Sequence, residues 1–263
     1  MTAVRVAAIQ HDIVWEDRAA TCARVEPWLD AAAAAGARLA VLTEMFAVGF
    51  SMRADAIAED EGGPTAQWLQ DQAKRHGMWI YGSIPERAAA TGARPCNVGV
   101  LSGPEGEVHR YAKLHPFTYA GEHELYDAGT STVTVDVEGL RVSLFVCYDL
   151  RFADDWWAIA PDTDCYVVCA NWPAARRAHW QALLVGRAIE NQAYVVGVNR
   201  VGQGGGLDYA GDSRIVDPMG EILAGGAGGE ALLVAEVDAG RVADVRATFP
   251  FLQDRRTGRP AQR

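Results

Sequence analysis

Short apolar runs of the kind that form β-strands alternate with longer helix-like segments along almost the whole chain. The strand-like runs span residues 4–10, 39–43, 78–83, 97–102, 132–137, 140–146, 165–170, 194–199, 213–217, 221–223 and 231–237, and the helix-like segments span residues 18–35, 64–76, 153–159 and 180–192. Residues 138–139 and 217–220 are typical of hairpin turns, which join antiparallel strands. Helix-linked strands together with hairpins predict an α/β layered fold with mixed sheets.

The composition fits one large folded domain or two small ones with an ample core. The 263 residues are 49% hydrophobic and 22% charged, and the formal net charge is −10. Nucleic acids and anionic membranes both repel an acidic surface, so we expect neither as a partner. The simplest interpretation of the negative charge is solubility.

The sequence indicates neither a signal peptide nor a membrane span. Residues 1–10 are short and flanked by polar side chains, and they are typical of a first strand. No apolar stretch reaches the roughly 18 residues that are needed to cross a bilayer. The five cysteines have no CxxC spacing and indicate free thiols, so we expect a cytoplasmic protein.

The histidines and carboxylates do not indicate a metal centre. The six histidines are scattered without an HExxH pattern. His115, Glu122, His123 and Glu124 come nearest to a cluster, but their spacing matches no metal motif. We therefore expect no metal ion.

Two glycine-dense segments, residues 202–206 and 225–229, are the other unusual stretches of the chain. A dinucleotide-binding turn would require a helix directly after the glycines, and no helix-like segment follows the first stretch. We therefore expect both segments to be flexible loops.

Cys147 stands directly after the apolar run 141–146 and opens a polar turn. The carboxyl ends of strands are where α/β proteins place reacting groups, whereas a structural cysteine more often lies inside the run, as Cys165 and Cys169 do. A thiol is a strong nucleophile only as the thiolate, so it needs a base or a positive field. His115 and His179 are candidate partners, although neither stands out.

Glu44 and Lys113 also lie beside apolar stretches. Glu44 is either a surface carboxylate or a general base that takes the thiol proton and later activates water. Lys113 is either a surface lysine or a fixed ammonium that stabilises a tetrahedral oxyanion. Together with Cys147, they provide the groups that nucleophilic catalysis needs.

Three segments of the chain carry a resemblance to a known family. Residues 42–45 (LTEM), 111–115 (YAKLH) and 145–152 (FVCYDLRF) resemble the three signature segments of the nitrilase superfamily of carbon–nitrogen hydrolases. The likeness extends from residue 4 to residue 222. Residues 121–124, 171–173, 179–181 and 187–194 most resemble the omega-amidases of the bacterial YafV type.

The resemblance implies a four-layer α-β-β-α sandwich with mixed sheets, formed by a single domain over residues 1–263. It implies Cys147 as the nucleophile, Glu44 as the general base and Lys113 as the oxyanion stabiliser. The backbone N–H of Tyr148 would be the second oxyanion donor. No cofactor is implied.

Many members carry a further glutamate after the lysine, which would hold the lysine and orient the substrate amide. Glu122 is the better match for this position, and Glu124 is the rival. Asp149 and Arg151 are expected to fix the turn after the nucleophile. The resemblance also implies a homodimer, and the C-terminal extension, residues 245–263, is expected to pack on the partner subunit.

The omega-amidase likeness implies dicarboxylic acid mono-amides, such as 2-oxoglutaramate or 2-oxosuccinamate, as small-molecule substrates. The distal carboxylate of such a substrate needs a cation, for which Arg176 is the candidate and Arg177 the alternative. Phe117, Tyr119 and Trp172 are candidates for the pocket walls and equally for ordinary core.

Three other interpretations remain open. The same chemistry fits another linear amide or a carbamoyl substrate. A non-catalytic binding protein on the same scaffold is disfavoured because all three catalytic residue types are present. A redox role for Cys147 needs a resolving thiol, and neither Cys165 nor Cys169 has an argued approach to it.

Overall fold

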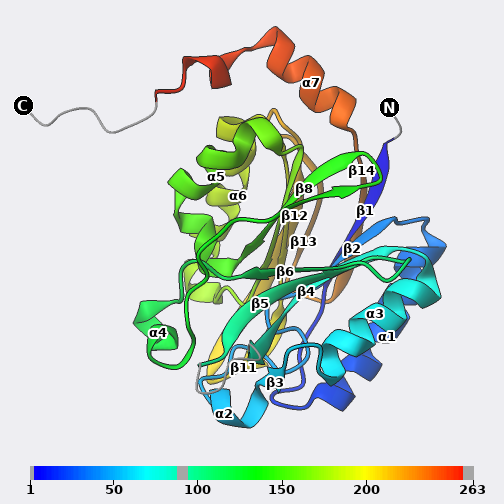
Figure 1. The fold of residues 1–263 in the computed structure, drawn as a ribbon, viewed down its shortest axis with the longest axis vertical. Coiled ribbons are helices and arrows are strands. Elements are labelled where there is room, and N and C mark those ends of the chain that lie inside the picture. The colour runs from blue at the N-terminus through cyan, green and yellow to red at the C-terminus, as the bar shows by residue number, and fades with distance from the viewer. Residues whose placement is uncertain (1–2, 88–93, 257–263) are drawn as a thin grey trace, which may run out of the picture.

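Two mixed β-sheets pack face to face in the computed structural model, which describes residues 3–87 and 94–256 (Figure 1). The first sheet has the order β14-β1-β2-β4-β5-β6, with β3 beside β4. Its strands are β1 (Val4–Gln10), β2 (Leu39–Val41), β3 (Glu59–Asp60), β4 (Trp79–Arg87), β5 (Cys96–Ser102), β6 (Val108–Ala112) and β14 (Ala231–Val237).

The second sheet has the order β11-β12-β10-β9-β8-β7, with β13 beside β12. Its strands are β7 (Thr134–Val137), β8 (Leu140–Val146), β9 (Cys165–Ala170), β10 (Tyr194–Asn199), β11 (Val201–Gly204), β12 (Leu207–Val216) and β13 (Ile222–Ala227). The adjacent strands β8, β9 and β10 are parallel, so the residues that follow each strand emerge at the same edge of the sheet.

Helices cover the outer face of each sheet. Helices α1 (Arg18–Ala34) and α3 (Pro64–His76) pack on the first sheet, and α5 (Ala153–Ile159) and α6 (Arg177–Asn191) pack on the second (Figure 1). The shorter helices are α2 (Ala54–Ile57), α4 (Glu122–Leu125) and α7 (Ala239–Thr248). This four-layer α-β-β-α arrangement confirms the expected fold class.

Strand β1 shows how the sequence builds two cores at once. Ala7 and Ile9 pack in the core beneath α1 and α3, whereas Val6 and Ala8 pack in the core shared by the two sheets. Successive side chains of a strand point to opposite faces, so a strand that is apolar at nearly every position must be covered on both sides. The near-continuous apolar runs of the sequence follow from this burial.

Most of the predicted elements are present, and helix α3 matches its predicted bounds. Pro64 begins α3, and Gly77 ends it with φ 60°, a left-handed conformation that glycine adopts without penalty. Strand β6 and helix α7 were not predicted. The C-terminal extension begins inside α7 and continues through a short 3-10 helix (Phe251–Asp254), while residues 257–263 lie outside the described residues.

The prediction that the glycine-dense segments are flexible loops is wrong. Residues 201–204 form β11 and pair with the start of β12, and residues 222–227 form β13. A Cβ atom on Gly204 would come within 2.5 Å of Arg200 Nη1 and 2.8 Å of the Trp15 ring. The glycine at this position therefore reflects close packing of a hairpin on its neighbours.

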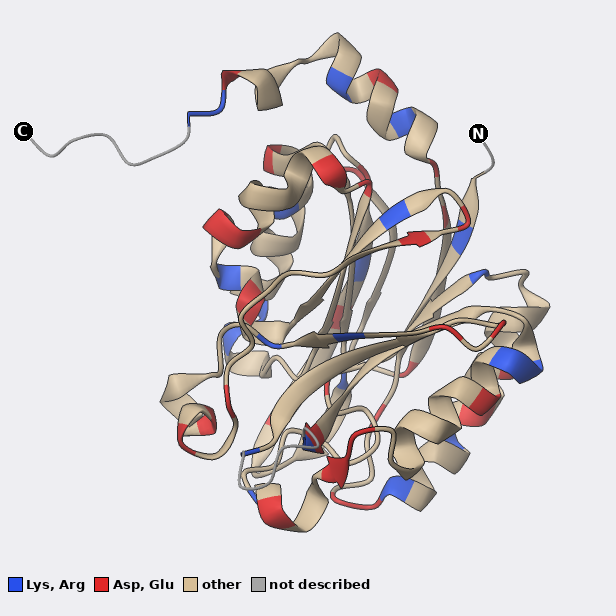
Figure 2. Cartoon of the chain, in the orientation of Figure 1, with Lys and Arg blue, Asp and Glu red and all other residues tan. Residues whose placement is uncertain are grey.

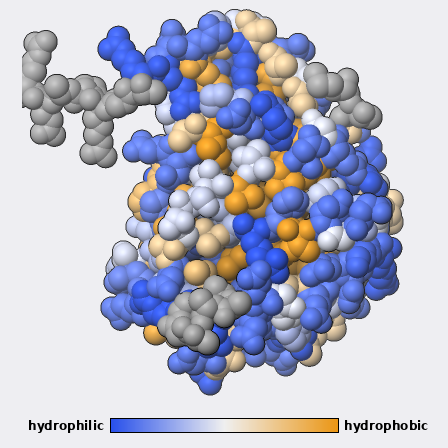
Figure 3. All heavy atoms as spheres, in the orientation of Figure 1, coloured by the Kyte–Doolittle hydropathy of each residue, from blue (hydrophilic) through white to orange (hydrophobic). Residues whose placement is uncertain are grey.

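Charged residues of both signs are interspersed over the helices and loops (Figure 2). On the face seen in Figure 3, hydrophobic side chains gather across the middle of the molecule, with hydrophilic side chains around them. Within the described part of the chain, no helix has the length and apolarity that crossing a membrane requires.

Candidate active site

Glu44, Lys113 and Glu122 form a buried charged cluster. The ammonium Nζ of Lys113 lies 2.9 Å from Glu44 Oε1 and 2.8 Å from Glu122 Oε2. All three side chains are at most 1% exposed. Asn97 supports both carboxylates, because its Nδ2 donates to Glu44 Oε1 at 2.8 Å and to Glu122 Oε1 at 3.1 Å. Each buried charge is thus paired, which offsets the cost of removing it from water.

The cluster joins the two sheets at one edge of the sandwich. Glu44 follows β2, Lys113 follows β6, and Asn171 directly follows β9 of the second sheet. The backbone N–H of Asn171 donates to Glu44 Oε2 at 2.8 Å, and its side-chain Nδ2 donates to the Glu44 carbonyl oxygen at 2.5 Å. The Glu44 carboxylate is therefore held from both sheets at a fixed position.

Cys147 lies at the carboxyl end of β8 in a left-handed conformation, with φ 45°. Residues other than glycine adopt this conformation only when their surroundings enforce it, and such residues gather at functional sites. Asp149 supplies the constraint on the turn: its carboxylate accepts from the Val146 N–H at 3.1 Å and from the Tyr111 hydroxyl at 2.8 Å. The expected turn-fixing role of Asp149 agrees with these contacts.

Burial raises the pKa of Asp149 to about 6, although Lys113 and the hydrogen bonds to its carboxylate oppose the shift. Burial also raises the pKa of the Cys147 thiol well above its usual range, and the Glu44 carboxylate raises it further, while Lys113 lowers it. Burial opposes the charge on Lys113, but Glu122 and Glu44 hold its pKa well above the usual range. The arrangement therefore pairs a protonated thiol with a permanent ammonium at neutral pH.

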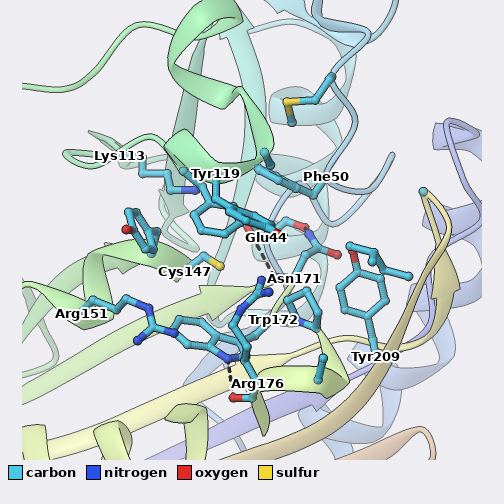
Figure 4. A pocket seen from close by; sticks show the side chains of 18 residues that line it. Glu44, Phe50, Lys113, Tyr119, Cys147, Arg151, Asn171, Trp172, Arg176 and Tyr209 are labelled. Carbon is cyan, nitrogen blue, oxygen red and sulfur yellow. Dashed lines mark hydrogen bonds and ion pairs between the residues drawn. The ribbon is translucent and has the colours of Figure 1, made fainter.

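A cavity of about 430 Å³ opens onto Cys147, Glu44 and Lys113 (Figure 4). The residues predicted to contact substrate all line it: Phe117, Tyr119, Tyr148, Trp172 and Arg176. Trp172 is buried, whereas Tyr119 is 87% exposed and lies at the rim. Trp172 thus belongs to both the cavity wall and the core, whereas Tyr119 belongs to the cavity wall alone.

Two guanidinium groups border this cavity. Arg176 lies over the Phe117 ring at 5.3 Å, and Arg151 lies over the Trp172 ring at 4.8 Å. Neither arginine has an ion-pair partner among residues 3–87 and 94–256, so both remain available to an anionic ligand. Arg177, the alternative to Arg176, instead pairs with Asp212 at 2.8 Å and lies outside the lining.

The remaining candidates lie elsewhere. Glu124 is exposed, so Glu122 alone of the two glutamates contacts Lys113. His115 pairs with Asp155 at 2.6 Å, and His179 contacts Arg151, so neither histidine reaches Cys147. Within the part of the chain that the structure describes, no three histidine, cysteine or acidic side chains gather as a metal site would require.

Several residues of the site were not predicted. Asn97 lies in β5 between the two carboxylates, and Tyr209 of β12 lines the cavity. Arg151, assigned only to the turn, also lines the cavity. Asn97 is a polar residue in a largely apolar strand, and the sequence does not indicate its partners. Tyr209 was missed because the glycine-dense segment before it was wrongly interpreted as a flexible loop.

Comparison with known proteins places this site in a family. Residues 5–247 match the model of the carbon-nitrogen hydrolase family. The chain is 40% identical to Omega-amidase YafV of Escherichia coli (strain K12) over 97% of both chains, and 33% identical to the 2-oxoglutaramate amidase of Bacillus subtilis (strain 168) over 81% of this chain and 83% of that protein.

The fold is also shared with a solved structure. The CN-hydrolase superfamily protein XC1258 from Xanthomonas campestris, crystallised with an arsenic adduct in its active site, superposes with a TM-score of 0.91. It is 35% identical, and the match covers 99% of this chain and 100% of that one. The chain therefore belongs to the carbon-nitrogen hydrolase family of the nitrilase superfamily and is a carbon–nitrogen hydrolase.

Proposed function

We propose that this enzyme is an omega-amidase, which releases ammonia from the ω-amide of a dicarboxylic acid mono-amide. The observation that carries the proposal is the presence in one cavity of a thiol, a carboxylate and an ammonium, together with the guanidinium of Arg176, which has no ion-pair partner within residues 3–87 and 94–256. The likeness to omega-amidases and to a 2-oxoglutaramate amidase supports the same substrate class.

The first half of the reaction makes a thioester. Cys147 transfers its proton to Glu44, and Sγ attacks the amide carbon. The resulting oxyanion is stabilised by Lys113 Nζ and by the backbone N–H of Tyr148. Collapse of the intermediate breaks the C–N bond, and the proton held by Glu44 passes to the leaving nitrogen, so ammonia departs and the acyl group remains on sulfur.

The second half of the reaction returns the enzyme to its starting state. Glu44 takes a proton from water, and the hydroxide attacks the thioester carbon. The same oxyanion donors stabilise the second intermediate, which collapses to a carboxylic acid and the Cys147 thiolate. The thiolate recovers its proton from Glu44. Glu122 keeps Lys113 in place throughout, and no cofactor takes part.

Arg176 provides the positive charge that the distal carboxylate of the substrate requires. Its guanidinium lies over the Phe117 ring, which limits its motion, and its N–H groups have no partner in the described part of the chain. A cation fixed in this way within the cavity favours a substrate with a carboxylate over a neutral amide of the same length.

Ammonia release from a panel of amides tests the proposal. We expect strong preference for 2-oxoglutaramate and succinamate over glutamine, asparagine and a neutral aliphatic amide. Cys147→Ala should abolish ammonia release without changing the circular dichroism spectrum. Cys22 is a buried cysteine of α1, and Cys22→Ala should still release ammonia. Full activity of Cys147→Ala would refute the mechanism, and equal rates on all amides would refute the substrate class.

Arg176→Ala tests the assigned cation separately. We expect the KM for succinamate to rise at least about tenfold, because a hydrogen-bonded ion pair with the carboxylate is lost. The KM for a neutral amide should change little. An equal rise for both substrates would show that Arg176 maintains the cavity rather than binding the carboxylate.

We also propose that the enzyme works as a homodimer in the cytoplasm. The exposed rings of Phe249 and Phe251, which lie 5.6 Å apart in the C-terminal extension, support a contact with a second copy. The cysteines are all free, which fits a reducing compartment.

A further inference from the structure

The hairpin formed by β11 and β12 builds one wall of the active-site cavity. Gly205, Leu207 and Tyr209 of this hairpin all line the cavity. Its glycines allow it to sit against two large side chains, since a Cβ on Gly205 would approach the Trp15 ring to 2.8 Å. The hairpin is therefore a packed wall whose side chains have defined positions.

Hydrogen bonds from the buried side chain of Arg200 hold the hairpin in place. This side chain is fully buried and donates to Asp12 Oδ1 at 2.8 Å and to the Gln203 carbonyl oxygen at 3.0 Å. The guanidinium also lies 4.6 Å from the centre of the Tyr209 ring. A cation stacked on an aromatic face holds the ring in one orientation, so Tyr209 presents its hydroxyl at a fixed place.

The Tyr209 hydroxyl differs from those of three other buried tyrosines. Tyr81, Tyr111 and Tyr166 are buried, and each hydroxyl donates to a protein oxygen at 2.8 to 3.0 Å. Among the residues that the structure describes, the Tyr209 hydroxyl has no such partner, although the side chain is only 6% exposed. Because this hydroxyl is not one of the fully buried, partnerless polar atoms of the described residues, it opens onto the cavity, where a bound ligand can accept its hydrogen bond.

The surroundings of Tyr209 identify the kind of acceptor. Figure 4 shows its ring at the side of the cavity that Glu44, Asn171 and Trp172 also border. Burial raises the pKa of Tyr209 to about 12, so the hydroxyl remains a donor at neutral pH. In the proposed reaction Lys113 and the Tyr148 N–H donate to the amide oxygen, and Glu44 gives a proton to the amide nitrogen. The acceptor that remains for the Tyr209 hydroxyl is therefore at the other end of the substrate.

We infer that Tyr209 is a specificity-determining residue whose hydroxyl donates a hydrogen bond to the distal carboxylate of the substrate, beside Arg176. This inference rests on the proposed omega-amidase function and deepens it. Arg176 supplies the charge, and Tyr209 supplies a directional donor on a wall that Arg200 holds rigid. The two contacts together distinguish a carboxylate from an apolar group of the same shape.

Tyr209→Phe tests the inference because it removes one oxygen atom and keeps the ring over Arg200. The substrates are succinamate, which has a carboxylate but no 2-oxo group, and 4-methylpentanamide, in which an isopropyl group replaces that carboxylate. We expect kcat/KM for succinamate to fall about tenfold to a hundredfold, as for the loss of a hydrogen bond to a charged group. The value for 4-methylpentanamide should change less than about twofold, because that substrate makes no such bond.

Tyr166→Phe is the matched control. It removes the hydroxyl of another buried tyrosine, which donates to the Trp156 carbonyl oxygen at 2.8 Å away from the cavity. We expect unchanged kcat/KM on both substrates. Inhibition by succinate gives a second measurement without turnover, and its inhibition constant should rise in Tyr209→Phe alone.

Equal losses on both substrates, or an unchanged inhibition constant for succinate, would overturn the role of Tyr209. Failure of the underlying function looks different: the wild-type enzyme would then show no preference for succinamate over 4-methylpentanamide. A selective loss in Tyr209→Phe, on an enzyme that prefers succinamate, supports both conclusions.

Discussion

The thiol of Cys147 experiences opposing charges at short range. Burial and the Glu44 carboxylate raise its pKa, and Lys113 lowers it, with the net result well above the usual range. A raised pKa means that the folded enzyme binds this proton tightly, so the thiol is protonated at pH 7 and ionises only at alkaline pH. Catalysis at neutral pH therefore depends on a base that accepts the proton during attack.

Glu44→Gln should accordingly separate thiol reactivity from catalysis. Removing the negative charge of Glu44 lowers the pKa of Cys147, so the thiolate fraction at pH 8 rises and alkylation by iodoacetamide becomes faster. Ammonia release should fall by about a hundredfold or more, because the general base is lost. Glu124→Gln, on an exposed side chain, should alter neither rate. Slower alkylation in Glu44→Gln would contradict the argument.

Glu122→Gln tests the support of Lys113. The ammonium would keep Glu44 but lose a carboxylate at 2.8 Å, so its position and charge are both less well held. We expect kcat to fall about tenfold to a hundredfold, because even a small displacement of the Lys113 ammonium from the reacting oxygen slows the reaction by this order. Glu124→Gln is again the control, and equal effects of the two substitutions would contradict the assignment of Glu122.

At the scale of elements, the β11–β12 hairpin depends on glycine at its contact with Trp15 and Arg200. Gly204→Ala would force a Cβ to within 2.5 Å of Arg200 Nη1 and 2.8 Å of the Trp15 ring. We expect a loss of about 1 to 3 kcal/mol in the free energy of unfolding, the usual cost of overpacking, together with weaker binding of succinamate. Chemical denaturation and steady-state kinetics measure the two effects.

Gly186→Ala is the control for the hairpin substitution. Gly186 lies inside α6, and a Cβ there would meet no atom within 4 Å. Alanine favours a helix interior over glycine by up to about 1 kcal/mol, so the stability should hold or rise while activity is retained. A loss of stability in Gly186→Ala equal to that in Gly204→Ala would show that the hairpin contact is not the cause.

The element scale also shows what could be predicted from the sequence. Strands buried on both faces were found because their apolar runs are short and bounded by turn residues, as in β8 and β9. The β11–β12 hairpin was missed because glycine weakens the local strand signal. The glycines are needed there because the hairpin packs on Trp15, which is far away in the sequence. Asn97 and Tyr209 were missed for a related cause, since their roles depend on partners that only the tertiary fold supplies.

At the scale of the whole molecule, the two sheets act as a frame for the site. Glu44 follows β2 of the first sheet and Asn171 follows β9 of the second, 127 residues apart in sequence, yet two hydrogen bonds join them. The apolar core between the sheets fixes their separation, and the carboxyl ends of β8 and β9 deliver Cys147 and Asn171 to the same edge. Catalytic geometry is thereby set by the packing of the sandwich.

The proposed homodimer gives the last prediction. Phe251 is 59% exposed and contacts only Phe249 among the aromatic rings of the described residues, so an unpartnered apolar pair stands near the start of the C-terminal extension. Burying such rings against a second copy would remove apolar area from water on both chains at once, because a two-fold interface uses the same patch twice.

Light scattering coupled to size exclusion should give a mass near twice the 28.3 kDa of one chain. Phe251→Glu should shift this mass toward the monomer, because a charge would be buried in the contact, whereas Val14→Glu, at another exposed apolar residue, should leave it unchanged. A monomeric wild-type chain, or a Phe251→Glu variant that remains dimeric at micromolar concentration, would place the contact elsewhere or remove it.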